Sequence, residues 1–246
     1  RSQLMISLAF AQYHKDKDDA LALRRLEEAT AALHDETSRQ HRFLARLRTG
    51  QVLFFSGQLR KAFDLTRALA EAPRPVPPPL RALSHSIAGL SSGFLAEFQS
   101  SDRYLKESLR YSKRAGIPQL VLPVEIQRQL HFYLQGQLAA AIEANSNSAR
   151  FPFPIPSNLA FSVRILVQLD RLDEAREAYA QLLHTVSASG SSFGLFTLGD
   201  AALFAEDDEM ARKVLEATTG AEALSQTPLM RSLAWFSAVL ARAQLG

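Results

Sequence analysis

The fold of this chain is decided by a short motif, Gly57-Gln58-Leu59-Arg60-Lys61-Ala62, in which a turn residue and an apolar residue precede an alanine. The motif recurs as Gly136-Gln137-Leu138-Ala139-Ala140-Ala141 and as Asp170-Arg171-Leu172-Asp173-Glu174-Ala175. With looser copies at Asp18-Asp19-Ala20, Asp102-Arg103-Tyr104-Leu105 and Glu209-Met210-Ala211, the ends of successive motifs lie 34 to 43 residues apart. This period, with helical patterns on both sides of each turn, predicts stacked helical hairpins.

Each alanine of the motif is small enough for the second helix of a hairpin to lie close against the first. The preceding Gly or Asp supplies the turn or the helix cap. Apolar residues recur at helical spacing on both sides of the turn, as in Leu47 and Phe54 before it and Leu59, Phe63 and Leu69 after it. One hairpin cannot bury both of these faces, so we expect neighbouring hairpins to stack.

These repeats resemble the tetratricopeptide family. Leu166, Ala175 and Tyr179 match the family's large apolar, alanine and aromatic positions, and Gly50 and Gly57 lie seven residues apart as the family's paired glycines do. The resemblance covers nearly the whole chain. It implies an all-α fold, a right-handed superhelical solenoid of about six hairpins plus a C-terminal helix.

The repeats also depart from the family pattern. Thr66 and Asn145 occupy the aromatic position of the second helix, and no hairpin has the family's tryptophan. Divergent repeats of unequal length are similar to those in the regulatory domains of large bacterial transcription activators, including LuxR-type regulators with a central ATPase. This similarity is specific for fold rather than for function.

We expect residues 1–246 to form one domain. The predicted hairpins are 2–34, 39–72, 78–115, 118–149, 154–187 and 191–219, with a last helix over about 227–245. Two proline-rich stretches, 73–79 and 152–156, cannot lie inside helices and are predicted to be connections. If the array bends, the sequence places the bend near 146–157.

The composition excludes several classes of protein. Hydrophobic residues make up 47% of the chain, which is too many for a disordered protein. No window approaches the ~18 uninterrupted apolar residues of a membrane span. There are no cysteines, and the net charge of +3 is too small to indicate direct nucleic-acid binding. We expect a cytoplasmic protein and, because the chain begins at Arg1, a part of a longer one.

No catalytic motif occurs in the required context. Residues 190–194 read Gly-Ser-Ser-Phe-Gly with His184 nearby, but a nucleophile elbow needs a strand before the serine, and a helix is predicted there. Residues 16–19 are predicted to cap a helix rather than to begin a calcium loop, because Leu21 replaces the required glycine. The six histidines show no metal-ligand spacing. We therefore predict no enzyme activity, no metal and no cofactor.

The resemblance implies that the first helices of successive hairpins line a concave groove. Polar residues that lie off the buried stripe of these helices are the candidate ligand contacts. They are Arg42, Arg46, Arg81, His85, Arg128, His131, Asn158 and Arg164.

Residues 39–81 hold nine Arg or Lys against two acids, whereas the whole chain is nearly balanced. In one interpretation these cations form a solvated face or pair with acids on adjacent helices. In the other they form a basic part of the groove that receives a carboxylate from a peptide C-terminus, an acidic helix or an anionic small molecule.

The leading functional hypothesis is a regulatory domain of a bacterial regulator that binds a protein, a peptide or a small anionic inducer in its groove. The alternative is a scaffold for protein assembly, such as the soluble part of a membrane-linked complex. We expect no contact with nucleic acid or membrane from this domain itself. The apolar last helix, which holds Leu229, Leu233, Trp235, Phe236 and Leu240, is a candidate surface for homodimerisation.

Overall fold

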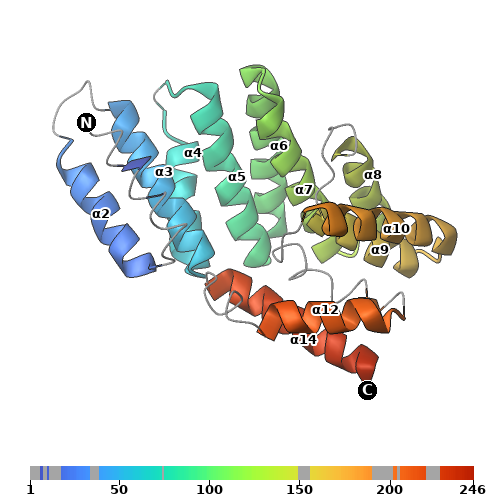
Figure 1. Cartoon of the computed structure of the whole chain (residues 1–246). Coiled ribbons are helices and arrows are strands. Elements are labelled where there is room, and N and C mark those ends of the chain that lie inside the picture. Colours follow the sequence, from blue (N-terminus) through green and yellow to red (C-terminus); the bar gives the residue numbers. More distant parts are fainter. Residues whose placement is uncertain are drawn as a thin grey trace. The chain divides into compact units, whose positions relative to one another are not determined.

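The computed structural model describes residues 6–7, 10, 18–33, 39–73, 75–148, 156–189, 202–203, 206–219 and 228–246. Every regular element within these ranges is a helix (Figure 1). The chain divides into two compact units, an N-terminal unit of Arg1–Gln127 and a C-terminal unit of Arg128–Gly246. The boundary falls inside α7 (Pro118–Leu134).

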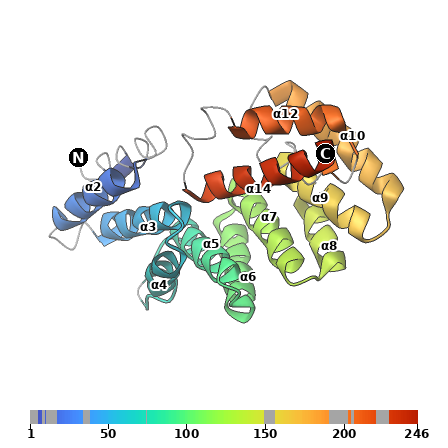
Figure 2. The same cartoon turned by 90° about the horizontal axis from the view of Figure 1, so that it is seen from below.

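In the N-terminal unit, α2 (Asp19–Ala31), α3 (Arg39–Phe55), α4 (Leu59–Ala70), α5 (Pro78–Phe94) and α6 (Phe98–Ala115) precede α7. Each helix from α2 to α5 packs on the next one, and α3 also contacts α5 (Figures 1 and 2). Contacts between first helices of adjacent hairpins are what a stacked helical-repeat fold requires.

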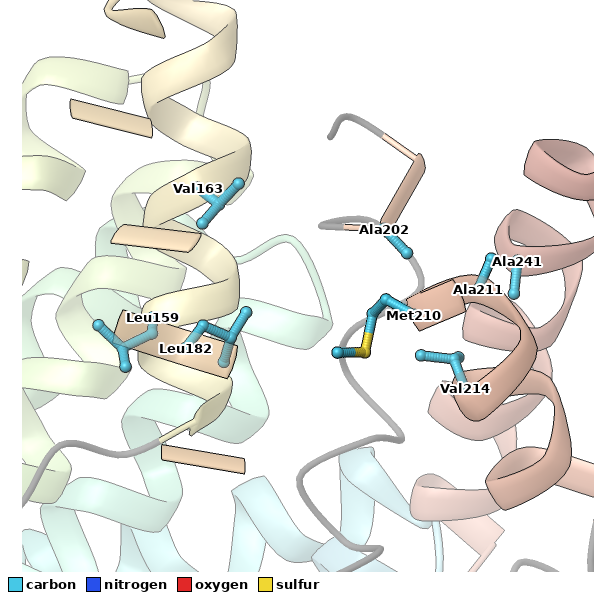
Figure 3. Packing of buried hydrophobic residues seen from close by; sticks show 8 residues of the cluster. All are labelled: Leu159, Val163, Leu182, Ala202, Met210, Ala211, Val214 and Ala241. Atoms are coloured by element: carbon cyan, nitrogen blue, oxygen red, sulfur yellow. The ribbon is translucent and has the colours of Figure 1, made fainter. Parts of the chain in front are cut away.

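In the C-terminal unit, α8 (Leu138–Ser148), α9 (Pro156–Gln168), α10 (Leu172–Ser189), α12 (Asp208–Thr219) and α14 (Pro228–Leu245) follow the end of α7. Their core includes Leu159, Leu182, Met210, Val214 and Ala241 (Figure 3). The predicted hairpins therefore agree with the observed helices to within a few residues wherever the structure describes them.

One backbone conformation closes every described hairpin turn. Gly57, Ala96, Gly136, Asp170 and Glu206 each have a left-handed φ between 52° and 78°. The next residue donates its N–H to the carbonyl five residues earlier, as Gln58 does to Leu53 at 2.9 Å. This bond satisfies a carbonyl that would otherwise lack a partner at the end of the first helix.

In each of these turns the residue five positions after the left-handed residue is small. These small residues are also buried. They are Ala62, Ser101, Ala141, Ala175 and Ala211.

Two of the predicted motif positions were wrong. The turn of the third hairpin lies at Ala96, so its small residue is Ser101, and Leu105 lies a turn further along α6. In the first repeat, Ala20 is exposed and Ala22 is buried. The corrected positions, with Ala22 as the first, recur every 34 to 40 residues.

The small residues allow close helix contacts in the N-terminal unit. A Cβ atom at Gly50 of α3 would lie 2.4 Å from Cγ2 of Thr66 in α4. A Cβ at Gly89 of α5 would lie 2.7 Å from Cδ2 of Leu105 in α6. Thr66, which stands where the family has an aromatic residue, packs its methyl group closely against Gly50.

Asp18 caps α2 by accepting the Leu21 N–H at 2.9 Å, which confirms the predicted cap. Most of the predicted bend at 146–157 and all of the sequence at 190–194 lie outside the described residues. None of the helices in the described ranges combines the length and hydrophobicity that crossing a bilayer requires.

Candidate functional site

A cleft of about 500 Å³ opens in the N-terminal unit between the first half of α3 and the connection from α4 to α5. We call it the arginine cleft. Its lining comes from α2, α3, the end of α4 and the proline-rich stretch. The lining residues are Thr30, Arg39, Gln40, Arg42, Phe43, Arg46, Ala68, Leu69, Ala72, Pro75, Val76, Pro77 and Leu80.

The helical period of α3 brings its cationic residues into this cleft. Arg39, Arg42 and Arg46 follow one another at intervals of three and four residues, which places them on one side of the helix together with Phe43. Arg39 and Arg46 are exposed and Arg42 is half-buried. Arg39 and Arg42 each take part in a further interaction within the chain. Arg46 makes no hydrogen bond or ion pair with the residues that the structure describes.

The wall opposite α3 is apolar. It consists of Leu69 and Ala72 at the end of α4, followed by Pro75, Val76 and Leu80. Because prolines restrict the backbone, this wall loses little conformational freedom when a ligand binds. No carboxylate belongs to the described lining, so the cleft combines positive charge on one side with an apolar surface on the other.

Arg81 was predicted to contact the ligand, but the structure uses it to hold the apolar wall. Its guanidinium donates hydrogen bonds to the carbonyls of Leu69 at 3.3 Å, Ala70 at 2.6 Å and Ala72 at 2.9 Å. These carbonyls lie at the end of α4, where intrahelical partners are lacking and a cation is favoured. The backbone N–H of Arg81 also donates to the carbonyl of Pro77. Because the guanidinium already binds the carbonyls at the end of α4, we leave Arg81 out of the proposed ligand contacts.

Several other cations of the 39–81 segment are used within the fold. Arg60 pairs with Glu97 at 2.6 Å and Arg67 with Asp64 at 3.4 Å. The guanidinium of Arg48 lies 4.2 Å from the ring centre of Phe10, and burial lowers its pKa. The interpretation of a solvated or paired face therefore describes these side chains, while the cations on the first half of α3 line the cleft.

His85 belongs to the core of the N-terminal unit rather than to its surface. It is 6% exposed, and its ring lies beside Tyr104 and Tyr111. Nδ1 lies 2.8 Å from the carbonyl of Arg81 and must donate, because a carbonyl oxygen only accepts. Burial lowers the pKa of His85, which favours the neutral ring. We leave His85 out of the proposed site.

The remaining predicted contacts lie in the C-terminal unit. Arg128 lies over Phe132, with 5.5 Å to the ring centre, and Arg164 lies over Tyr133 at 4.8 Å. His131 is buried, and its Nε2 accepts a hydrogen bond from the Gln135 amide at 2.7 Å. The Asn158 side chain and those of His14 and His34 are outside the described set. The arginine cleft is not lined by Arg128, His131 or Arg164.

A second cleft, of about 870 Å³, lies in the C-terminal unit. Its apolar lining includes Val163, Val167, Leu172, Tyr179 and Leu183, and residues 206–208 form an acidic edge. Helix capping already uses part of this edge.

Asp207 links this acidic edge to α10. It accepts a hydrogen bond from the Tyr179 hydroxyl at 2.6 Å and caps α12 by accepting the Met210 N–H at 2.9 Å. Burial and the bond to Asp207 raise the pKa of Tyr179. Both carboxylate oxygens of Asp207 are therefore engaged within the fold, and we place the candidate site in the arginine cleft.

A polar cluster beside the arginine cleft was not predicted. The hydroxyl of Tyr104 donates to Glu71 at 2.5 Å, and Arg103 donates to the same carboxylate oxygen at 2.7 Å. Burial and the bond to Glu71 raise the pKa of Tyr104 to about 12. The hydrogen bond from Tyr104 lowers the pKa of Glu71. No periodic signal joins residues 71 and 104, which are far apart in the sequence.

The described part of the chain contains neither a metal-binding cluster nor the serine of the G-x-S-x-G sequence. No group of three or more His, Cys, Asp or Glu side chains is arranged there to hold a metal ion. The G-x-S-x-G sequence at 190–194 is outside the described residues. The absence of a cofactor thus stays a prediction.

Solved structures similar to this chain share its helical-repeat fold. Aspartyl phosphate phosphatase F from Bacillus subtilis has a TM-score of 0.66 and 12% identity, over 100% of this chain and 74% of that chain. The apo form of RapI has a TM-score of 0.64 and 11% identity, over 100% of this chain and 99% of that chain.

A third similar structure is the Rap conjugation gene regulator of the plasmid pLS20 in complex with the Phr* peptide. Its TM-score is 0.62 and its identity 12%, over 97% of this chain and 74% of that chain. The chain has a tetratricopeptide-like helical-repeat fold. At this level of identity the likeness is one of fold alone. No family model matches the chain, and a search of curated proteins finds no similar sequence.

Proposed function

We propose that this chain is a regulatory binding module that takes a peptide, or a peptide segment of a protein partner, in the arginine cleft. One observation carries the proposal: three arginines on one side of α3 face an apolar, proline-rich wall, with no carboxylate in the described lining. Clefts that bind ligands commonly combine an apolar surface with a few well-placed polar groups. Arginine is well suited to bind carboxylates through two parallel hydrogen bonds.

The similar structures support a peptide as the ligand. One of them is a Rap regulator in complex with a Phr* peptide, so this architecture accommodates a bound peptide in at least one protein. The finer proposal is that the chain regulates transcription as part of a larger bacterial protein, as its resemblance to LuxR-type regulators implies. A small anionic inducer would be the corresponding alternative ligand.

We also propose that the chain is not catalytic. Because one of the similar structures is named an aspartyl phosphate phosphatase, hydrolysis of an acyl phosphate should be assayed directly. Acetyl phosphate is a suitable probe. Release of phosphate above the rate of a heat-inactivated sample would overturn this part of the proposal.

The binding proposal can be tested by capture from a mixture of short synthetic peptides of varied sequence. Immobilised wild-type protein is expected to retain a subset of peptides that the Arg46→Glu variant does not retain. Arg114→Glu is the matched control, because Arg114 is exposed on α6 and, like Arg46, follows another arginine by four residues. The same peptides retained by wild type and by Arg46→Glu would rule out the arginine cleft as the binding site.

A scaffold for protein assembly is the second candidate function, and the exposed apolar face of α14 favours it. This helix buries Ser237, Ala238 and Ala241 but leaves Trp235 68% and Phe236 43% exposed. An exposed apolar helix face of this kind is typical of an interaction surface. Sedimentation over a wide concentration range tests the homodimer. A constant monomer mass, unchanged by Trp235→Ser, would count against it.

A further inference from the structure

We infer, building on the proposed function, that the arginine cleft recognises the C-terminal end of a peptide whose last side chain is apolar. The terminal carboxylate binds Arg42 and Arg46, and the last side chain lies against Phe43, Leu69 and Val76. Three kinds of ligand were compatible with the sequence: a peptide C-terminus, an acidic helix and an anionic small molecule. The geometry of the cleft favours the first.

The charged side of the cleft fits one carboxylate. Arg42 and Arg46 are separated by four residues on α3, which places them about 6 Å apart along the helix axis. Each guanidinium has five donors, so Arg42 can keep its interaction within the chain and still bind a carboxylate. The exposed Arg46 is the principal anchor, since it makes no ion pair with the described residues.

The cleft has the size of a small-ligand pocket. Its volume of about 500 Å³ is within the range of pockets that hold small ligands, about 300–1,000 Å³. An extended chain end, with one residue inside and the rest leading out, fits this space.

The apolar wall argues against a simple anion. Phe43 and Val76 are half-buried and Leu69 is buried, and all three line the space that the arginines face. A small anion would leave these side chains in contact with water. A C-terminal residue supplies both groups that the cleft complements, a carboxylate and an apolar side chain on the same carbon atom.

The test compares two pools of short N-acetylated peptides that are identical except at the last residue's carboxyl group. One pool ends in the free acid and the other in the carboxamide, and each contains members with leucine and with serine at the last position. Binding is measured by competition against a fluorescent peptide selected in the capture experiment. We expect the free acids to bind at least about tenfold more tightly than the amides, and leucine more tightly than serine.

Variants connect this preference to the cleft. Arg46→Glu is expected to remove the preference for the free acid, Arg46→Lys to keep part of it, and Arg114→Glu to keep all of it. Circular dichroism melting of each variant verifies that it is folded. Retention of the preference by a folded Arg46→Glu protein would assign the carboxylate to another site and overturn the inference.

The remaining outcomes separate this inference from the proposed function. Equal binding of acids and amides, with loss of both in Arg46→Glu, would keep the cleft as a peptide site and refute recognition of the chain end. A preference for acids that serine and leucine share equally, and that inorganic phosphate abolishes, would reduce the site to one for simple anions. Failure of both pools and of the capture experiment would refute the proposed function itself.

Discussion

The contact between Gly50 and Thr66 gives the sharpest test of the packing on which the cleft depends. Gly50 lies in α3, and a Cβ atom added there would meet Cγ2 of Thr66 at 2.4 Å, while the next contacts lie at 3.9 Å. Thr66 is fully buried and its hydroxyl donates to the carbonyl of Ala62 at 2.7 Å. Being β-branched and hydrogen-bonded, this side chain cannot rotate its methyl group away without losing a bond.

The expected magnitude follows from these contacts. Overpacking by one methyl group costs about 1–3 kcal/mol, and replacing glycine by alanine within a helix recovers about 1 kcal/mol. We therefore expect Gly50→Ala to lower the free energy of unfolding by about 1 kcal/mol, within a range of about 0–2 kcal/mol. Thr66→Ser removes Cγ2 but keeps the hydroxyl, and loss of this buried methyl should cost about 1 kcal/mol.

The double variant Gly50→Ala/Thr66→Ser is decisive. The new Cβ then occupies the space that the threonine methyl left, so the double variant should be about as stable as wild type. The coupling free energy in the double-mutant cycle should be about 2 kcal/mol. Denaturant unfolding should be followed by circular dichroism, because the single tryptophan, Trp235, is in the other unit. Additive effects of the two substitutions would refute the close α3–α4 packing.

Three further predictions concern the polar contacts that surround the clefts. Arg81→Met should lower the free energy of unfolding by about 2 kcal/mol, because the carbonyls that end α4 lose a charged donor. Denaturant unfolding measures this loss. A variant as stable as the wild type would contradict the role of Arg81 in holding these carbonyls. Glu71 has a lowered pKa in the fold, so its contribution to stability is present above about pH 4.5 and is lost as the pH falls through its folded pKa. Tyr104→Phe should therefore reduce the loss of stability on acidification. If the melting temperatures of the wild type and the variant fall by the same amount as the pH is lowered, the contribution of the Tyr104–Glu71 hydrogen bond is excluded. Asp207→Ala should lower the free energy of unfolding by about 1–2 kcal/mol, because α12 loses its cap and the Tyr179 hydroxyl loses its acceptor. Amide hydrogen exchange at the start of α12 should then be faster, and a rate equal to that of the wild type would contradict the prediction.

The hairpins were predictable because their periodicity is local. Amphipathic spacing and the turns at Gly57 and Gly136 are properties of a few consecutive residues, and they located most helices to within a few residues. The third turn escaped because Ala96 adopts a left-handed conformation that is usual for glycine. The left-handed φ of Ala96 and the backbone hydrogen bond that this turn shares with the others identify it in the structure.

The site was predictable only on one of its two sides. Helical spacing was sufficient to group Arg42 with Arg46, since both belong to one helix. The opposite wall depends on how residues 72–80 return along α3, and this path is determined by tertiary contacts such as those of Arg81. Sequence could identify the proline-rich stretch as a connection, but it could not place that connection beside the arginines.

The burial of His85 was missed for a related reason. Residues 84–89 of α5 are all buried, so this helix has core contacts around most of its circumference. A helix with serine, glycine and alanine on several faces has no clear apolar stripe, and a polar residue on it cannot be assigned to the surface by periodicity. The predicted location in the cytoplasm and the homodimer stay predictions.

The central claim is that a peptide binds in the arginine cleft, and hydrogen–deuterium exchange of the complex tests it most directly. The protein should be measured alone and with the tightest-binding free-acid peptide from the competition experiment. The account predicts slower exchange in the first half of α3 and in residues 68–81, which form the two sides of the cleft. Unchanged exchange in both segments, with protection confined to the C-terminal unit, would contradict it.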